Sequence, residues 1–172
     1  MKLEGIHHVT CITADAPGNV DFYVRVLGLR LVKKSVNQDD PTVYHLFYAD
    51  EKGSAGSDLT FFEYPQARRG RAGLGMVHTI VFRVGSTEAV DFWAERLAAE
   101  GVQVDRDGDK LRFDDPEGLA FEIATIGPGF IVDEPLETLG ERLSLPPDYE
   151  NLRERVEPLL TPLPNPRELV KR

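Results

Sequence analysis

Two histidines and one glutamate stand at spacings that suit a metal site. Shifting the sequence against itself by 70 positions places His8 on His78, and a shift of 60 places Phe62 on Glu122. Two imidazoles and one carboxylate form the facial triad that holds non-haem Fe(II) and leaves positions open for O2 and a substrate. We therefore expect a metal site made of His8, His78 and Glu122, with Fe(II) as the ion and Mn(II) as a compatible alternative.

The residue that matches Glu122 in the first half is Phe62, which cannot bind a metal. A fourth protein ligand would suit metal-assisted isomerisation or hydrolysis better than oxygen chemistry, so its absence favours an oxygenase. Glu63 is adjacent but points to the other face of an ideal strand. The alternative without a metal is that His8 and His78 are hydrogen-bonded strand residues and Glu122 is a buried, paired acid.

The elements that would position these residues form an internal repeat of two similar units. The shift of 70 also aligns 20–23 with 90–93, and the shift of 60 aligns 59–62 with 119–122. Each copy begins with a strand, continues with a helix that stops at Gly28 or Gly101, and adds three strands. The predicted strands are 6–13, 30–36, 42–48 and 59–64 in the first copy, and 76–84, 102–105, 110–113 and 119–123 in the second.

A β-α-β-β-β unit leaves one face of its sheet uncovered, so two units must pair to bury it. We expect an α+β fold in which two such modules form a cleft and a C-terminal helical arm follows. The arm should contain helices near 136–143 and 149–159. The expected division is a first module at 1–64, a linker at 65–75, a second module at 76–126 and an arm at 127–172.

Composition narrows the class of protein. A formal charge of −9 argues against a nucleic-acid partner, because such binding depends on clustered cations. Arg68, Arg69 and Arg71 fall in a Gly-rich stretch that we interpret as a solvated linker. No apolar run approaches the ~18 residues of a membrane span, so we expect no membrane association. The single Cys11 excludes an intrachain disulfide and, with the other features, predicts a cytoplasmic protein.

A further signal comes from longer stretches of sequence, which are 6–10 (Ile-His-His-Val-Thr), 22–34, 36–46, 58–62, 67–70 and 121–146. Together they resemble a known family, the hydroquinone-type ring-cleaving dioxygenases of the vicinal oxygen chelate superfamily. That superfamily also contains glyoxalase I, catechol dioxygenases and bleomycin-resistance proteins. The resemblance implies Fe(II), O2 and a small hydroquinone or catechol-like substrate, with His8, His78 and Glu122 as ligands.

Two departures from the family pattern bear on the site. Family members are about twice as long and carry four units, so this chain joins a first unit to a last-like one. We therefore expect a homodimer, in which His8 of one chain meets His78 and Glu122 of the other; the alternative is a site within one chain. Val77 and Arg112 also stand where the family usually has a histidine and a tyrosine.

Four further residues are candidates for catalysis. His7 and Thr10 match neighbours of the first ligand in the family, and His7 would accept a proton although an ideal strand turns it away from the metal. His45 would act as acid or base if its strand face lines the cleft, and a purely structural role is equally open. Arg112 would favour an anionic substrate if it enters the cleft.

Two other functions compete with the dioxygenase. One is a glyoxalase-like lyase or isomerase, which would want a fourth ligand and a redox-inert metal. The other is a non-catalytic module that binds a flat aromatic compound, as bleomycin-resistance proteins do, and that would not need three matched ligands. Metal analysis separates the last from both enzymes.

Overall fold

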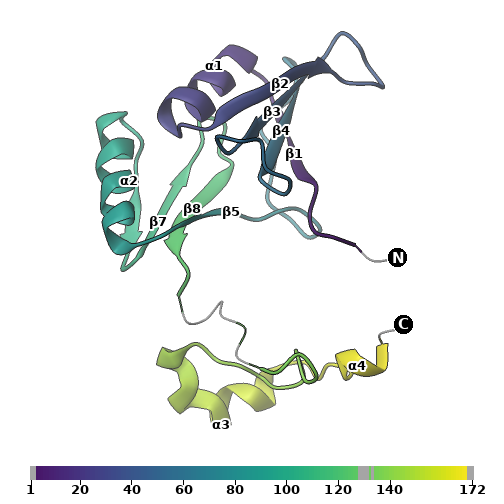
Figure 1. The fold of residues 1–172 in the computed structure, drawn as a ribbon, viewed down its shortest axis with the longest axis vertical. Coiled ribbons are helices and arrows are strands. Elements are labelled where there is room, and N and C mark those ends of the chain that lie inside the picture. The colour runs from purple at the N-terminus through teal and green to yellow at the C-terminus, as the bar shows by residue number, and fades with distance from the viewer. Residues whose placement is uncertain (1–2, 128–131, 133, 170–172) are drawn as a thin grey trace.

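The computed structural model describes residues 3–127, 132 and 134–169, and two four-stranded sheets dominate it (Figure 1). In each sheet the first strand pairs in parallel with the fourth, and the others pair antiparallel. The first sheet, in the order β1-β4-β3-β2, contains β1 (His8–Thr13), β2 (Arg30–Val36), β3 (Tyr44–Ala49) and β4 (Asp58–Glu63). The second, in the order β5-β8-β7-β6, contains β5 (Ile80–Val84), β6 (Asp105–Asp107), β7 (Lys110–Asp114) and β8 (Ala120–Thr125). The expected α+β fold of two β-α-β-β-β units is confirmed.

The first helix changes type along its length. The helix α1 (Ala16–Val20) begins where Asp15 accepts a hydrogen bond from the backbone N–H of Gly18 at 3.2 Å. It runs directly into a π-helical turn, η1 (Asp21–Val26), which the sequence periodicity does not reveal. The chain then leaves the helix at Gly28, whose φ of 69° is a left-handed conformation that glycine adopts without strain.

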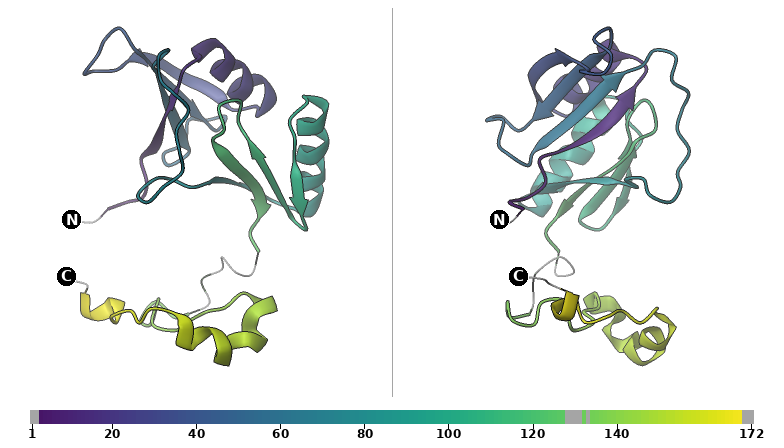
Figure 2. Two further views of the ribbon diagram at one scale, coloured as in Figure 1. Left: turned by 180° about the vertical axis from the view of Figure 1, so that it is seen from behind. Right: turned by 90° about the vertical axis from the view of Figure 1, so that its right-hand side faces the viewer.

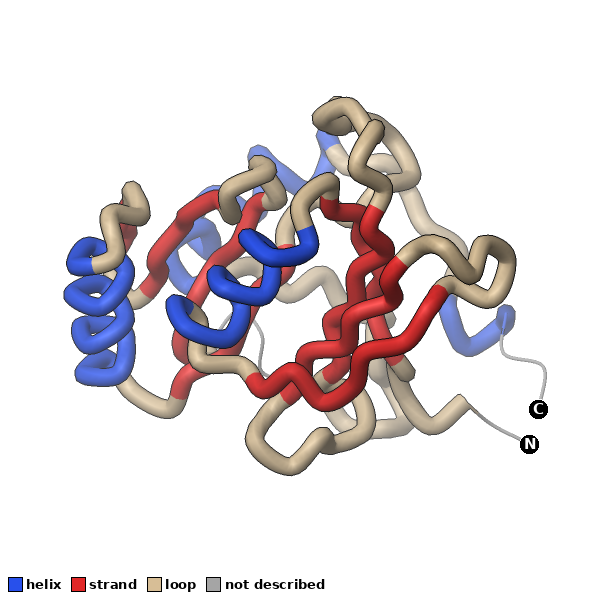
Figure 3. Tube along the Cα trace, turned by 90° about the horizontal axis from the view of Figure 1, so that it is seen from above, coloured by secondary structure: helices blue, strands red, loops and turns tan. Residues whose placement is uncertain are grey.

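Both units share one hydrophobic core. Tyr23 of η1 is fully buried, and its ring centroid lies 4.8 Å from that of Phe61 in the first sheet and 5.9 Å from that of Phe121 in the second. The helix α2 (Thr87–Ala99) packs on β7 and β8. Figure 3 shows that α1 and η1 lie between α2 and the first sheet. The guanidinium of Arg96 on α2 donates to the backbone carbonyl of Val26 at 2.7 Å and so joins the helices of the two units.

A second set of hydrogen bonds joins the units beside this core. The Tyr23 hydroxyl donates to the buried carboxylate of Asp115 at 2.9 Å. The backbone N–H of Ala14 donates to Glu117 Oε1 at 2.7 Å, and Arg69 Nε donates to the Glu117 carbonyl at 2.7 Å. The linker is therefore hydrogen-bonded to the second unit through Arg69, rather than being only solvated.

The C-terminal arm differs from the prediction in its first half. The stretch 136–143 is not helical: residues 136–141 form turns, and Gly140 adopts a φ of 78° that interrupts a helix. Figures 1 and 2 show the arm standing apart from the sheets. Residues 128–131 and 133, at the start of the predicted arm, lie outside the described part. The arm's short helices are η3 (Pro147–Leu152), α3 (Arg153–Val156), η4 (Glu157–Leu159) and α4 (Pro166–Leu169).

Across the residues that the structure describes, none of the helices combines the length and the apolar character needed to cross a lipid bilayer.

Candidate metal and substrate site

His8 opens β1 on the face of the first sheet that turns away from the shared core. His8, Thr10 and Ile12 are exposed, while the alternate residues Val9 and Cys11 pack against the core. Thiol chemistry does not fit this core-facing side, because burial, with a smaller contribution from the Asp115 carboxylate, raises the pKa of Cys11 to about 11.

The neighbour of His8 holds its ring by a direct hydrogen bond. His7 Nδ1 and His8 Nδ1 lie 2.8 Å apart, and the two rings meet edge to face. On an ideal strand, His7 was expected to point away from the metal site. His7 lies before the first residue of β1, so the alternation of side chains along a strand does not apply to it. When His8 donates from Nδ1, its Nε2 keeps the lone pair that a metal requires.

Polar and aromatic groups follow His8 along the same face. His45 on β3 lies between the rings of Phe47 and Phe62, at centroid distances of 4.0 and 4.2 Å. His45 Nε2 lies 3.2 Å from Thr60 Oγ1, and Thr60 donates to Thr10 Oγ1 at 2.9 Å. The face that carries His45 is therefore the face that carries Thr10 and His8.

The environment of His45 favours its neutral form. Desolvation beside the two phenyl rings lowers its pKa from the ordinary value of 6.5, and the nearby charges of His8 and Lys33 lower it further. Lys33 on β2 lies over the Phe47 ring, with Nζ 5.6 Å from the centroid. His45 is therefore harder to protonate than an exposed histidine.

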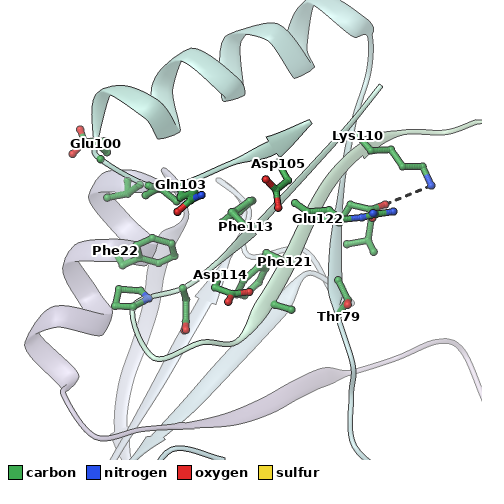
Figure 4. Close-up of a pocket in the computed structure, with 18 of the residues that line it drawn as sticks. Phe22, Thr79, Glu100, Gln103, Asp105, Lys110, Phe113, Asp114, Phe121 and Glu122 are labelled. Carbon is green, nitrogen blue, oxygen red and sulfur yellow. Dashed lines mark hydrogen bonds and ion pairs between the residues drawn. The ribbon is translucent and has the colours of Figure 1, made fainter. Parts of the chain in front are cut away.

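His78 and Glu122 line the same cavity beside the second sheet. The strand predicted at 76–84 includes His78, but the observed β5 begins two residues after it. The cavity is open, with a volume of about 1180 Å³. His78 Nδ1 lies 2.7 Å from Thr79 Oγ1. This contact leaves Nε2 for a metal in the same way as at His8. Figure 4 shows Thr79 and Lys110 on the Glu122 side of this cavity, with Phe22 and Glu100 toward its other end.

The Glu122 carboxylate has two cationic partners. Its side chain is only 12% exposed, and Arg112 Nε lies 3.2 Å and Lys110 Nζ 3.8 Å from its oxygens. The pairing follows from the sheet register, in which Arg112 on β7 stands directly opposite Glu122 on β8. Arg112 does enter the cavity, as the anionic-substrate hypothesis requires, but there it neutralises Glu122.

One chain does not bring the three predicted ligands together. Among the described residues, no group of three or more His, Cys, Asp or Glu side chains lies close enough to hold a metal ion. His78 and Glu122 share a cavity that His8 does not line. The chain therefore presents a candidate two-ligand set, His78 and Glu122, at one cavity and a single candidate ligand, His8, on the outer face of the first sheet.

The donor chemistry nevertheless fits a divalent ion. Both imidazoles have Nδ1 engaged and Nε2 remaining, and Glu122 supplies a carboxylate that is mostly withdrawn from water. Phe62, which stands in the fourth corner, packs on His45 and offers no donor. The donor types are those that a facial triad uses, but in one chain they lie at two separate places.

The comparison with protein families decides the broad class. The model of the glyoxalase/bleomycin resistance protein/dioxygenase superfamily matches residues 5–123. The chain belongs to this superfamily. Both sheets and both helices of the paired units lie within the matched region, except for the last two residues of β8.

Relatives within the superfamily are named as dioxygenases. A Bacillus subtilis protein provisionally named ring-cleaving dioxygenase MhqA is 50% identical over 123 residues, which cover 69% of this chain and 39% of that protein. The chlorohydroquinone/hydroquinone 1,2-dioxygenase of Sphingobium indicum is 37% identical over 130 residues, covering 71% and 40%. A solved structure provisionally described as a Bacillus subtilis dioxygenase superposes with a TM-score of 0.65 at 44% identity, covering 70% of this chain and 40% of that one. The matched region thus spans about two fifths of the length of these relatives.

Two features of the site were not predicted from the sequence. One is Thr60, which is fully buried and links His45 to Thr10. Because Thr60 and Phe62 alternate along β4, strand periodicity would have placed Thr60 on the same sheet face as Phe62. The other is Lys110, which shares Glu122 with Arg112. Lys110 and Arg112 alternate on β7 in the same way, so strand periodicity contained this signal too.

Proposed function

We propose that this chain is an Fe(II)-dependent ring-cleaving dioxygenase that acts on a small hydroquinone or catechol-like aromatic with O2. The active form would be a homodimer in which His8 of one chain meets His78 and Glu122 of a second copy. The proposal rests chiefly on one observation, the division of a facial-triad donor set between two sheet surfaces of the same chain. The names of the relatives point to the same chemistry.

Geometry and symmetry support the homodimer. A two-fold axis that brings the first sheet of one copy onto the second sheet of the other would create two identical sites, each with a complete ligand set. A site within one chain would require the two sheets to move relative to a core that Tyr23, Phe61 and Phe121 fill from both sides. A site shared between two copies of the chain needs no such movement of the sheets.

In this proposal the protein's own residues prepare the ligands. His7 and Thr79 fix the two imidazoles so that Nε2 faces outward. Arg112 and Lys110 hold the Glu122 carboxylate in place through two ion pairs before a cation arrives. A ferrous ion, once bound, would supply the redox chemistry that lets O2 react with an electron-rich ring; Mn(II) is the alternative ion with the same ligand preferences.

The direct test of this function is oxygen consumption. Protein purified without air and loaded with Fe(II) should consume O2 in a one-to-one ratio with hydroquinone, chlorohydroquinone or catechol, measured with an oxygen electrode against a protein-free blank. His78→Ala should retain less than about 1% of this rate, because loss of a ligand removes the ion.

A matched control is Glu95→Ala, which removes an exposed side chain from α2 without touching the cavity. It should consume O2 at the wild-type rate. Tight metal binding without O2 consumption would contradict the dioxygenase and favour the glyoxalase-like reaction. Absence of metal binding would leave a small-molecule-binding module.

A further inference from the structure

We propose that Thr10, Thr60 and His45 form a proton relay that links the metal end of the first sheet to an acid–base group inside an aromatic stack. The inference rests on the proposed dioxygenase function and assigns the path of a proton within that site. His45 does not touch the substrate in this proposal. It exchanges a proton with the substrate through the hydroxyls of Thr60 and Thr10, so its role is indirect.

The geometry of the three residues supports a continuous path. Thr10 stands opposite Thr60 in the parallel pairing of β1 and β4, and their hydroxyl oxygens lie 2.9 Å apart. Thr60 Oγ1 lies 3.2 Å from His45 Nε2, which reaches it diagonally from β3. Each separation is within hydrogen-bonding range, and threonine hydroxyls rotate to donate in either direction.

The two ends of the path have different exposure. Thr10 is exposed and lies two residues after His8 on the same strand face, so an aromatic hydroxyl bound at His8 would meet the Thr10 hydroxyl. Thr60 is fully buried, and a buried hydroxyl is kept for the bonds that it makes. His45 is half-buried between Phe47 and Phe62, which restrict its ring to the orientation that reaches Thr60.

The proton transfer balances without any other reagent. A proton leaves the aromatic O–H and binds Thr10 Oγ1, the Thr10 proton moves to Thr60 Oγ1, and the Thr60 proton moves to His45 Nε2. The substrate oxygen becomes negative and the His45 ring positive, and the reverse sequence returns the proton to a product oxygen. Lys33 on β2, His8 on β1 and Asp58 on β4 flank the path on this face. Beyond them, His7 contacts His8 and Tyr64 packs against Phe62.

Kinetics of the Fe(II)-loaded wild-type protein and three variants test the relay. His45→Gln should lower kcat for hydroquinone about a hundredfold or more while KM stays within about threefold, as expected when acid–base assistance is lost. Thr60→Val keeps the shape of the side chain but removes the hydroxyl, so it should show the same change. Tyr44→Phe alters an exposed neighbour on the opposite face of β3 and should behave as wild type.

The pH dependence separates a relay from a packing role. The relay needs neutral His45, so wild-type kcat should fall as pH drops through a pKa below 6.5, and this limb should be absent in His45→Gln. An independent measurement uses nitrogen NMR of the His45 ring in protein without metal. Thr60→Val should shift the ring proton between Nε2 and Nδ1 and change its titration.

The outcomes are distinguishable. An active wild type with unchanged kcat and pH profile in His45→Gln overturns the relay and leaves the dioxygenase intact. An identical His45 tautomer and titration in wild type and Thr60→Val also overturns it. A wild type that turns over none of the diols overturns the proposed function and the relay with it.

Discussion

A mixture of two inactive variants, His8→Ala and Glu122→Ala, is expected to recover about a quarter of the wild-type turnover when the chains are unfolded and refolded together. Each variant alone lacks one ligand at every site. In a mixed dimer, one site combines His8 from the second variant with Glu122 from the first and is complete, while the other lacks both ligands. Random pairing makes half of the dimers mixed, and half of their sites are intact.

The control for this experiment is a mixture of His78→Ala with Glu122→Ala. Both residues belong to the same two-ligand set, since they line one cavity of one chain. Mixed dimers of these variants contain no complete site, so they should stay inactive. Recovery in both mixtures, or in neither while each variant still forms dimers, would contradict a site shared as proposed.

Phe121→Ala is expected to lower the free energy of unfolding by about 3–5 kcal/mol, the range for removing a large aromatic side chain from a packed core. Phe121 is 1% exposed, and its ring centroid lies 5.6 Å from Phe82, 5.7 Å from Phe113 and 5.9 Å from Tyr23. It is therefore the point where the second sheet meets the helix of the first unit. Urea unfolding followed by circular dichroism measures the effect.

An exposed phenylalanine on the same unit serves as the comparison. Phe92 on α2 is 54% exposed, and Phe92→Ala should change the free energy of unfolding by no more than about 0.5 kcal/mol. If Phe121→Ala does not fold, Phe121→Leu keeps most of the volume and should give a smaller, measurable loss. Equal losses at positions 92 and 121 would show that the shared core does not hold the two units together.

The repeated sequence pattern was sufficient to predict the fold but not the assembly of the site. Two strand-helix-strand-strand-strand units are visible because alternation and helical spacing are local properties of the chain. On β8, alternation puts Glu122 on the face opposite that of the buried Phe121. How the two units pack against each other depends on long-range contacts such as Tyr23 with Phe121, which no local pattern encodes. The sequence therefore did not decide whether His8 and His78 meet within one chain or between two chains.

The misplaced details have physical reasons as well. The predicted helix at 136–143 has apolar residues at suitable spacing, but Gly140 takes a left-handed conformation there. His7 was assigned to the opposite face because an ideal strand was extended through it, whereas β1 begins at His8. The role of Thr60 was missed because a threonine inside an apolar run looks like a strand former until its partners on β1 and β3 are known.

The measurement that tests the account most directly is the fate of isotopically heavy molecular oxygen in the product. Hydroquinone also oxidises to quinone without ring cleavage, and oxygen consumption alone does not separate the two reactions. The Fe(II)-loaded protein should yield a ring-opened product whose mass shows that both heavy oxygen atoms were incorporated, and the His8→Ala and Glu122→Ala variants should yield none. A quinone that carries no heavy oxygen, or a ring-opened product that forms equally well with either variant, would contradict a ring-cleaving dioxygenase at this three-ligand site.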